Sequence, residues 1–275
     1  MTVRTNASLG ERLWHRSERI LAGLVFAFLL GPILVIVPLS LSSGSLLTLP
    51  LPGLSLHWYE TIFTDPKWLT AAKNSLIIGT ATMVLATALG TLAALGLARS
   101  RLRWKGLLMA LMISPLVVPV VITGVAAFFF FAPLGLVGTH LGLILAHTAL
   151  AAPFVVITVT ATLQGYDQTL SRAGLSLGAR PARVFRDVTL PLILPGVLSG
   201  ALLAFATSFD EIVVVLFMAS PAQHTLPRQI FSGIRENTDP SVAAAGVVLV
   251  LLSALLMVAV EWLRRRSLRL QGRKD

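Results

Sequence analysis

Long, uncharged apolar runs alternate along the chain with short polar and basic intervals. The first run, Ile20 to Leu41, has 22 residues, and the second, Ser75 to Ala98, has 24. A helix of about 20 apolar residues crosses the hydrocarbon core of a bilayer, whereas the apolar part of a secretory signal peptide has only about 7–15 residues. Both runs therefore predict membrane helices, and we expect the first to be retained.

The third apolar region is too long for one helix. Residues 106–166 include no charged side chain over 61 positions. A single helix of that length would measure about 90 Å, roughly three times the thickness of the hydrocarbon core. The run must therefore fold back, and Pro133 to Gly138 contains the residues that interrupt a helix most readily. This predicts a third span near 107–131 and a fourth near 141–163.

Two further runs complete the pattern. The fifth predicted span covers about 192–218, and the sixth covers 241–260, just before a cluster of three arginines. The predicted fold class is an all-α integral membrane protein with six transmembrane helices. We expect one membrane domain over residues 20–263, between an N-terminal tail, 1–19, and a basic tail, 264–275.

Composition and charge support this interpretation and give it an orientation. The chain is 55% hydrophobic and only 12% charged, with a mean hydropathy of +0.83, which excludes an ordinary soluble domain. Of its 22 Lys and Arg residues, 18 fall in the N-terminal tail, the second and fourth connections and the C-terminal tail, and 4 fall in the other loops. Positive charge accumulates on the cytoplasmic side of membrane proteins. Both termini are therefore predicted to be cytoplasmic.

Catalytic and metal-binding patterns do not stand out. The sequence has no Gly-Lys-Ser or Gly-Lys-Thr of a phosphate-binding loop, no His-Glu-x-x-His metal helix and no cysteine. His140 and His147 are about two helical turns apart, but no carboxylate or thiol is close to them in the sequence, which favours packing histidines over metal ligands. The basic residues are not interleaved with aromatic residues on one segment, so no nucleic-acid partner is predicted.

The polar interval 170–196 between the fourth and fifth spans reads LSRAGLSLGARPARVFRDVTLPLILPG. The pattern predicts a small amphipathic helix, a corner at Gly178–Pro181, a second short helix and then Leu190-Pro191. It resembles the cytoplasmic loop signature of permease subunits of binding-protein-dependent ATP-driven importers. That signature is Glu-Ala-Ala, three residues, Gly, nine residues, Ile, one residue, Leu-Pro. An ordinary basic cytoplasmic loop is the alternative.

Seven residues match the signature frame or stand at its positions: Arg172, Ala173, Gly174, Gly178, Val188, Leu190 and Pro191. Three of them depart from the pattern, because Arg172 replaces Glu, Gly174 replaces Ala and Val188 replaces Ile. The resemblance implies that the short helix around 173–178 lies in a cleft of an ATPase subunit. It also implies that Gly178 permits a tight corner and that Leu190-Pro191 ends the coupling segment and fixes its angle to the fifth span.

Asp210 and Glu211 are the charged residues within the predicted fifth span. A charged side chain in the middle of a membrane helix costs about 2.5–3.5 kcal/mol on insertion scales, so such residues face a cavity or a partner. In one interpretation, one of them pairs with Arg228 or with a neighbouring helix, and the other reaches the outer interface. A second interpretation places both on a translocation path for cations, where Asp210 faces the path and Glu211 helps to hold the helix, although the sequence does not fix which does which.

The segments Thr148–Gly165 and Phe205–Arg235, which include Phe209, resemble the second permease of spermidine/putrescine-type importers, and the likeness covers about residues 60–265. The resemblance implies a subunit of the bacterial inner membrane that works with two ABC ATPase subunits, an extracytoplasmic solute-binding protein and a second, non-identical permease. The ATP would be hydrolysed by the partner subunits, and this chain would bind no cofactor. Related permeases for opines, phosphonates or ferric iron look alike.

Two other functions compete with the importer permease. A self-sufficient channel or secondary transporter would use Asp210 and Glu211 as its ion or proton site. An integral-membrane enzyme is disfavoured by the lack of a nucleophile with its base or of a metal-ligand set. The sequence leaves the transported solute open.

Overall fold

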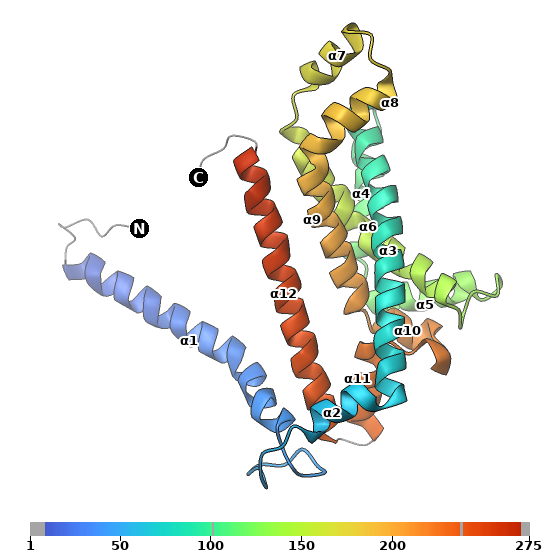
Figure 1. Ribbon diagram of the computed structural model, residues 1–275. Coiled ribbons are helices and arrows are strands. Elements are labelled where there is room, and N and C mark those ends of the chain that lie inside the picture. The colour runs from blue at the N-terminus through green and yellow to red at the C-terminus, as the bar shows by residue number, and fades with distance from the viewer. Residues whose placement is uncertain (1–8, 101, 237–238, 271–275) are drawn as a thin grey trace. The chain divides into compact units, whose positions relative to one another are not determined.

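The computed structural model describes residues 9–100, 102–236 and 239–270, and these residues form an all-helical chain (Figure 1). The chain divides into two compact units, one made of residues 1–63 and 233–250 and the other of residues 64–232 and 251–275. Within the described ranges, the nearest approach to a β-structure is one isolated antiparallel bridge between Ser42 and Leu54.

The smaller unit contains α1 (Leu9–Ser40), a loop and most of α2 (His57–Thr64). The Ser40 hydroxyl bonds to the Tyr59 hydroxyl at 2.8 Å, and the Trp58 indole donates to the carbonyl of Gly44 at 3.2 Å. These bonds hold the loop against α2. Because α1 begins at Leu9, the helix includes part of the predicted tail 1–19; residues 1–8 and 271–275 lie outside the described residues.

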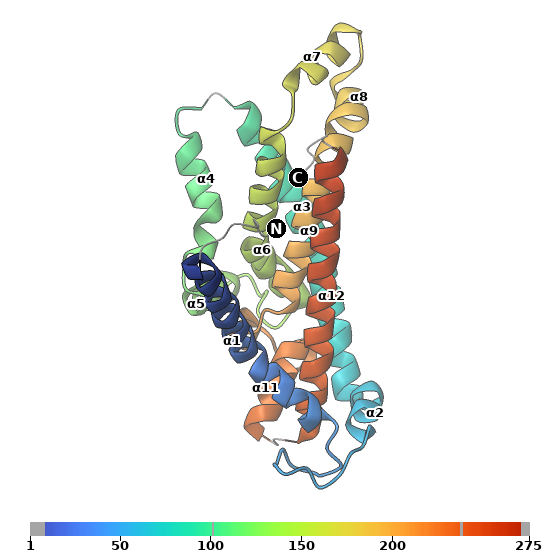
Figure 2. The same ribbon diagram turned by 90° about the vertical axis from the view of Figure 1, so that its left-hand side faces the viewer.

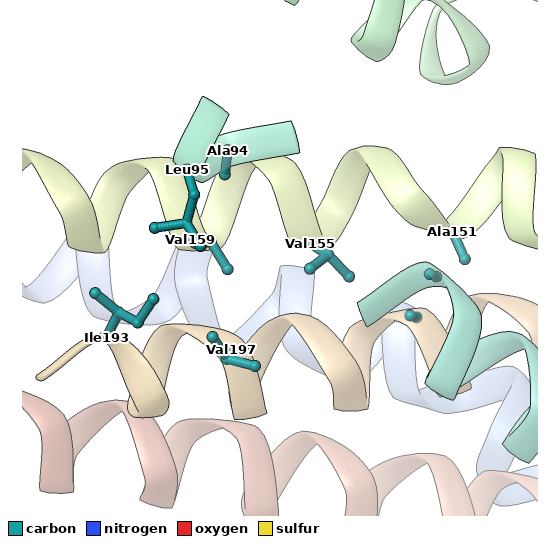
Figure 3. Close-up of a cluster of buried hydrophobic side chains, with 9 residues drawn as sticks. Ala94, Leu95, Ala151, Val155, Val159, Ile193 and Val197 are labelled. Atoms are coloured by element: carbon teal, nitrogen blue, oxygen red, sulfur yellow. The ribbon is translucent and has the colours of Figure 1, made fainter. Parts of the chain in front are cut away.

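The larger unit is built around three helices that lie side by side in both views (Figures 1 and 2). They are α3 (Pro66–Arg99), α6 (His140–Gln164) and α9 (Leu190–Phe209). Val155, Val159 and Ile193 are completely buried where the three helices meet (Figure 3). Each helix is apolar on most of its surface, so packing between helices, rather than an amphipathic pattern, sets which residues form this core.

Glycines allow these helices to approach closely. A Cβ atom on Gly90 of α3 would lie 2.7 Å from the Cβ of Val155, and one on Gly200 of α9 would lie 3.0 Å from the Val155 Cα. Val155 of α6 therefore packs between two helix backbones without side chains at those points. Small residues that permit such contact are typical of helix interfaces in membranes. Gly96, by contrast, faces open space.

The third predicted span, 107–131, is not a straight helix. It consists of α4 (Lys105–Ile113), a 3₁₀ turn (Ser114–Leu116) and α5 (Val120–Phe131), with a bend of 99° between the two halves. Pro119 stands immediately before α5 and supplies no N–H to continue the helix. The predicted turn at 133–138 is present, because Gly135 and Gly138 have positive φ angles of 67° and 74°.

The fifth predicted span, 192–218, is also interrupted. The helix α9 ends at Phe209, and a separate short helix, α10 (Val213–Met218), follows after three residues and packs against α5. The prediction that Asp210 and Glu211 lie within a continuous helix was therefore wrong. The two carboxylates lie in the break, where polar side chains can bond to backbone groups that a helix would otherwise use.

The chain continues through a 3₁₀ turn (Pro221–Gln223) and α11 (Leu226–Glu236) to α12 (Pro240–Leu270). Among the described residues, five helices are long and apolar enough to cross a membrane, and the number is six if the bent pair α4 and α5 forms one span. The described fold is thus all-α, with five or six candidate membrane helices. The helices α3 and α6, with 34 and 25 residues, are longer than the length needed to span.

Candidate functional sites at the two ends of α9

The signature loop begins with α7 (Gln168–Ser176), a helix of nine residues. Asp167 caps it, since its carboxylate accepts a hydrogen bond from the Thr169 N–H at 2.9 Å. This hydrogen bond lowers the pKa of the exposed Asp167 side chain below its ordinary value. A carboxylate at this position satisfies a free N–H and is favoured by the helix dipole, so α7 has a defined start.

The predicted corner after α7 is confirmed. Gly178 has a φ of +82°, and the N–H of Ala179 returns to the carbonyl of Gly174 at 3.2 Å. This is the usual end of a helix at a left-handed residue. A Cβ atom on Gly178 would meet nothing within 4 Å, so backbone conformation alone, and not lack of space, requires glycine at this corner.

The Leu190-Pro191 pair does not end the segment as predicted. Pro181 starts α8 (Pro181–Val184), and helical structure then continues without a break through a π-turn (Phe185–Thr189) into α9. The N–H of Leu190 bonds to the carbonyl of Phe185, five residues earlier. Pro191 has no N–H to donate, and the wider turn absorbs that gap in the ladder. The second half of the loop is therefore an extension of α9.

The two halves of the loop pack on each other at Gly174 and Val184. A Cβ atom on Gly174 would lie 3.1 Å from a methyl group of Val184, whose side chain is buried. Arg172 and Ala173 are exposed, and Val188 is half-buried within the π-turn. Leu177 is 88% exposed at the tip of the loop. The signature residues thus lie on a loop that folds back on itself (Figure 1), and its exposed side chains include basic and apolar ones.

A hydroxyl cluster that the sequence did not reveal ties this loop to α6. The Tyr166 hydroxyl bonds to Ser171 at 2.5 Å, and Ser171 bonds to the buried Thr189 at 3.2 Å. The three residues come from the end of α6, from α7 and from the π-turn. Their hydroxyls meet only because the chain folds back on itself, and no motif marks the set in advance.

The second site lies at the other end of α9. Asp210 follows the helix directly and is exposed, and its backbone N–H bonds to the Ala206 carbonyl at 3.0 Å. Its carboxylate makes no hydrogen bond or ion pair in the described part of the chain. The Glu211 carboxylate accepts a hydrogen bond from the Val214 N–H at 2.9 Å and so caps the start of α10. Phe209 is 5% exposed and stacks on Phe205, with ring centroids 5.3 Å apart.

Arg228 does not pair with either carboxylate. Its Nη1 donates to the carbonyls of Val215 and Ala219 at 2.8 and 2.9 Å and so caps the end of α10. The predicted ion pair between Arg228 and one of the two carboxylates is therefore not observed.

Asp210 and Glu211 line a hollow of 510 Å³ in the larger unit. Its other described lining residues are apolar or hydroxyl-bearing, and they come from the last turns of α9 and from α12: Leu203, Ala206, Thr207, Phe209, Ser253, Leu256, Met257 and Val260. The described wall thus carries two carboxylates and no basic side chain. In a partly dehydrated site such charges attract cations and repel anions.

The two histidines point to different contacts. His147 is buried in α6, with Nδ1 2.8 Å from the hydroxyl of Ser208 in α9, as expected of a packing histidine. The Nε2 of His140 lies 3.0 Å from the Asn74 side chain at the start of α3. Within the described ranges, no group of three His, Cys, Asp or Glu side chains is arranged to hold a metal ion.

Comparison with known proteins assigns the family. Residues 86–269 match the family described as the binding-protein-dependent transport system inner membrane component. The chain belongs to this family. It is therefore an inner-membrane permease, and this agrees with the long apolar helices and with the resemblance of the loop 170–196.

Two relatives of the permease differ in their transported solute. The spermidine/putrescine transport system permease protein PotC of Haemophilus influenzae is 32% identical over 88% of this chain and 94% of its own. The molybdenum transport system permease protein ModB of Mycobacterium bovis is 36% identical over 74% of this chain and 82% of its own. The two identities are similar, so sequence identity alone does not show which of the two solutes fits this permease better.

The fold has also been seen in a solved transporter. A bacterial alginate ABC transporter, in complex with an alginate pentasaccharide-bound periplasmic protein, contains a chain that aligns with a TM-score of 0.71. The alignment covers 96% of this chain and 97% of the other, with 15% sequence identity. At this identity the likeness shows that the permease shares the fold.

Proposed function

We propose that this permease imports a small organic cation of the polyamine class. The observation that carries the proposal is the hollow at the end of α9, whose described wall has two carboxylates and no basic side chain. An oxyanion, a phosphonate or a carboxylate solute would be repelled there. The chemistry of the wall thus favours the solute of the PotC relative over an anionic solute.

Within this site the two carboxylates have different roles. Glu211 bonds to the backbone of Val214, so it holds the start of α10. The Asp210 carboxylate is exposed at the hollow and makes no described hydrogen bond or ion pair, so it is the group that meets the solute. Phe209 forms an apolar wall beside Asp210. Apolar walls with a carboxylate suit a chain of methylene groups that ends in an ammonium.

The loop of residues 172–191 is the ATPase-docking element in this proposal. The chain has no phosphate-binding loop sequence, so two partner ATPase subunits hydrolyse the ATP, and this chain binds no cofactor. Three leucines of α7 and its end, Leu170, Leu175 and Leu177, are exposed, and several exposed apolar side chains on one short segment fit a protein contact. Arg172 stands where the family pattern has Glu, so we expect a neutral or acidic ATPase surface opposite it.

The helix α9 connects the two sites directly. The α8 segment and the π-turn extend α9 at one end, and Asp210 follows it at the other, about 30 Å away for its 20 residues. A displacement of the loop by ATPase closure therefore moves a helix whose far end carries the solute-facing carboxylate. Helical structure continues without a break through Leu190-Pro191, so it provides the coupling.

The topology and partners follow from the same proposal. If the bent α4–α5 pair forms one span, the chain has six spans, and an even number places both termini on one side, the cytoplasmic side by charge. The membrane domain would then cover residues 20–263. A second, non-identical permease would complete the path, and an extracytoplasmic binding protein would deliver the solute.

The ligand of the cognate binding protein tests the solute class. Calorimetric titration with spermidine, putrescine, molybdate, a phosphonate, an opine and ferric iron should give binding with a polyamine and none with the anions. Tight binding of an anion would contradict the proposed class. ATP dependence separates an importer from a channel, because uptake into vesicles should require the ATPase subunits, whereas a self-sufficient channel or secondary transporter would not need them.

A further inference from the structure

A second hollow, of 290 Å³, lies beside the signature loop and is lined in part by residues of that loop. It is bounded by the last turn of α3, the end of α6, α7 and α8. Arg99 and Arg172 supply its basic groups, and Tyr166, Gln168, Ser171 and Thr189 supply hydroxyl and amide groups. No acidic side chain is present in this described wall, so the hollow is chemically the opposite of the one at Asp210.

The two arginines are placed to bind an anion. Both are exposed, and within the described ranges neither forms an ion pair, although Arg172 acts on the more distant Asp167. Arg183 and Arg186 of the same loop differ, because both lie within 4.0 Å of the Asp187 carboxylate, at 3.9 and 2.8 Å. The hollow is thus lined by two basic groups that have no close acidic partner among the described residues.

Apolar side chains form the rest of the wall, at the end of the helix bundle that carries the signature loop. Leu95, Ala98 and Leu163 line the hollow together with Leu175, Pro181 and Val184. Arg99 directly follows the apolar run 75–98, so it stands where a spanning helix leaves the hydrocarbon core. Phosphate groups of lipids lie at this depth, and their first methylene groups lie next to them on the hydrocarbon side.

We propose that this hollow binds the phosphate headgroup of an anionic phospholipid. The basic groups face the phosphate, the Gln168 amide adds a hydrogen-bond donor, and the leucines contact the first part of the acyl chains. Basic pockets between spanning helices at the cytoplasmic surface bind lipid headgroups in this way. The assignment of the lipid to the cytoplasmic leaflet depends on the proposed topology, whereas the proposal that a lipid binds in this hollow does not. A carboxylate of the ATPase fits the apolar half of the wall less well.

The proposal gives the loop a lipid contact. The wall includes Ser171 and Arg172 from α7 and Arg99 from α3, which are far apart in the sequence. A bound phosphate would join the coupling loop to the helix bundle through two arginines. The lipid would then help to set the angle of α7 before the ATPase docks.

The test uses the whole importer complex, purified in detergent, with short-chain phosphatidylglycerol as the probe and phosphatidylcholine as the neutral comparison. Native mass spectrometry measures the lipid bound per complex during a titration. Arg99→Gln and Arg172→Gln should each weaken phosphatidylglycerol binding about fivefold, because each basic residue near a membrane surface contributes a comparable factor. The double variant should weaken it about 25-fold. Arg99→Lys keeps the charge and should retain binding.

Arg180→Gln is the matched control, because Arg180 is an exposed arginine of the same loop that does not line the hollow. It should leave phosphatidylglycerol binding unchanged. Equal binding of phosphatidylcholine, or no loss in the double variant, would overturn the proposal. Displacement of the lipid by millimolar inorganic phosphate would show a soluble-anion site instead. If Arg172→Gln released the ATPase while lipid binding persisted, the hollow would belong to the protein contact. None of these outcomes bears on which solute the binding protein holds.

Discussion

Glu211 and Arg228 hold opposite ends of the same six-residue helix, α10. The Glu211 carboxylate accepts the N–H of Val214 at its start, and the Arg228 guanidinium donates to the carbonyls of Val215 and Ala219 at its end. A negative group at the start of a helix and a positive group at its end both favour the helix dipole. An isolated helix this short is unstable, so these two side chains and packing against α5 stabilise it.

Removal of the Glu211 cap should loosen α10 because the Val214 N–H loses its hydrogen-bond acceptor, and not because a negative charge is lost. Glu211→Ala removes the acceptor and should cost about 0.5–2 kcal/mol, as other lost helix caps do. Glu211→Gln keeps an oxygen for the Val214 N–H and should cost much less. The measurement is the maleimide labelling rate of a cysteine placed at the buried Val215, in a chain that has no native cysteine. Equal labelling rates in the two variants would show that the cap does not hold α10.

The close contact of α3 with α6 predicts opposite results for two glycines of one helix. Gly90→Ala would place a methyl group 2.7 Å from the Val155 side chain and 3.1 Å from the Ala152 carbonyl, so it should lower the stability by about 1–3 kcal/mol, as overpacking does. Gly96→Ala meets nothing within 4 Å and should be neutral or raise stability by up to about 1 kcal/mol. Thermal unfolding of the purified permease measures both. Similar losses at the two positions would contradict the packing described.

Position 178 should require glycine because of its backbone conformation and not because space is lacking. Gly178→Ala should strain the loop by about 1–2 kcal/mol, because its φ is +82°. Gly165→Ala is the matched control, since Gly165 has a φ of −87° and a Cβ there would have ordinary contact at 3.7 Å. Gly178→Asn should be milder than Gly178→Val, because Asn tolerates the left-handed region. The readout is the amount of ATPase that copurifies. Equal retention in all four variants would contradict a role for this corner in docking.

The proposed topology gives a labelling pattern in the cysteine-free chain. Single cysteines in place of Ser43, Thr139 and Ser232 should react with a membrane-impermeant maleimide added outside intact cells. Cysteines in place of Ser100 and Ser176 should react only after the membrane is opened. The result at Thr139 depends on the α4–α5 pair, because Thr139 lies outside only if that bent pair crosses the membrane as one span. Reversal at any of the five positions would refute six spans with cytoplasmic termini.

The approximate place of the apolar helices could be predicted because the bilayer fixes how long such a run must be. The breaks inside those runs could not. Pro119 precedes a bend of 99°, yet Pro153 and Pro195 lie within α6 and α9 without ending them. Whether a proline interrupts a membrane helix depends on which neighbours satisfy the freed carbonyls, and a single sequence does not show those neighbours.

The candidate sites were predictable to different degrees. The corner at Gly178 follows from local backbone chemistry, so its place in the sequence was sufficient. The π-turn before Leu190 and the hydroxyl contact of Tyr166 with Ser171 depend on how α7 folds back on α6, which the spacing of the motif does not determine. The expected division of labour, with Glu211 holding a helix, agrees with its bond to Val214, although the helix it holds is α10 and not α9.

Uptake by the complete importer in proteoliposomes, with the cognate binding protein and labelled spermidine, tests the central claim most directly. Asp210→Asn keeps the shape of the side chain and removes the charge that faces the hollow. Opposite unit charges about 4 Å apart interact by a few kcal/mol at a protein surface, so uptake should fall about tenfold or more. Assembly and ATP hydrolysis should persist, and Glu211→Gln should transport better than Asp210→Asn. Native spermidine uptake in both variants, or ATP-driven uptake of an anion by the native complex, would contradict the account.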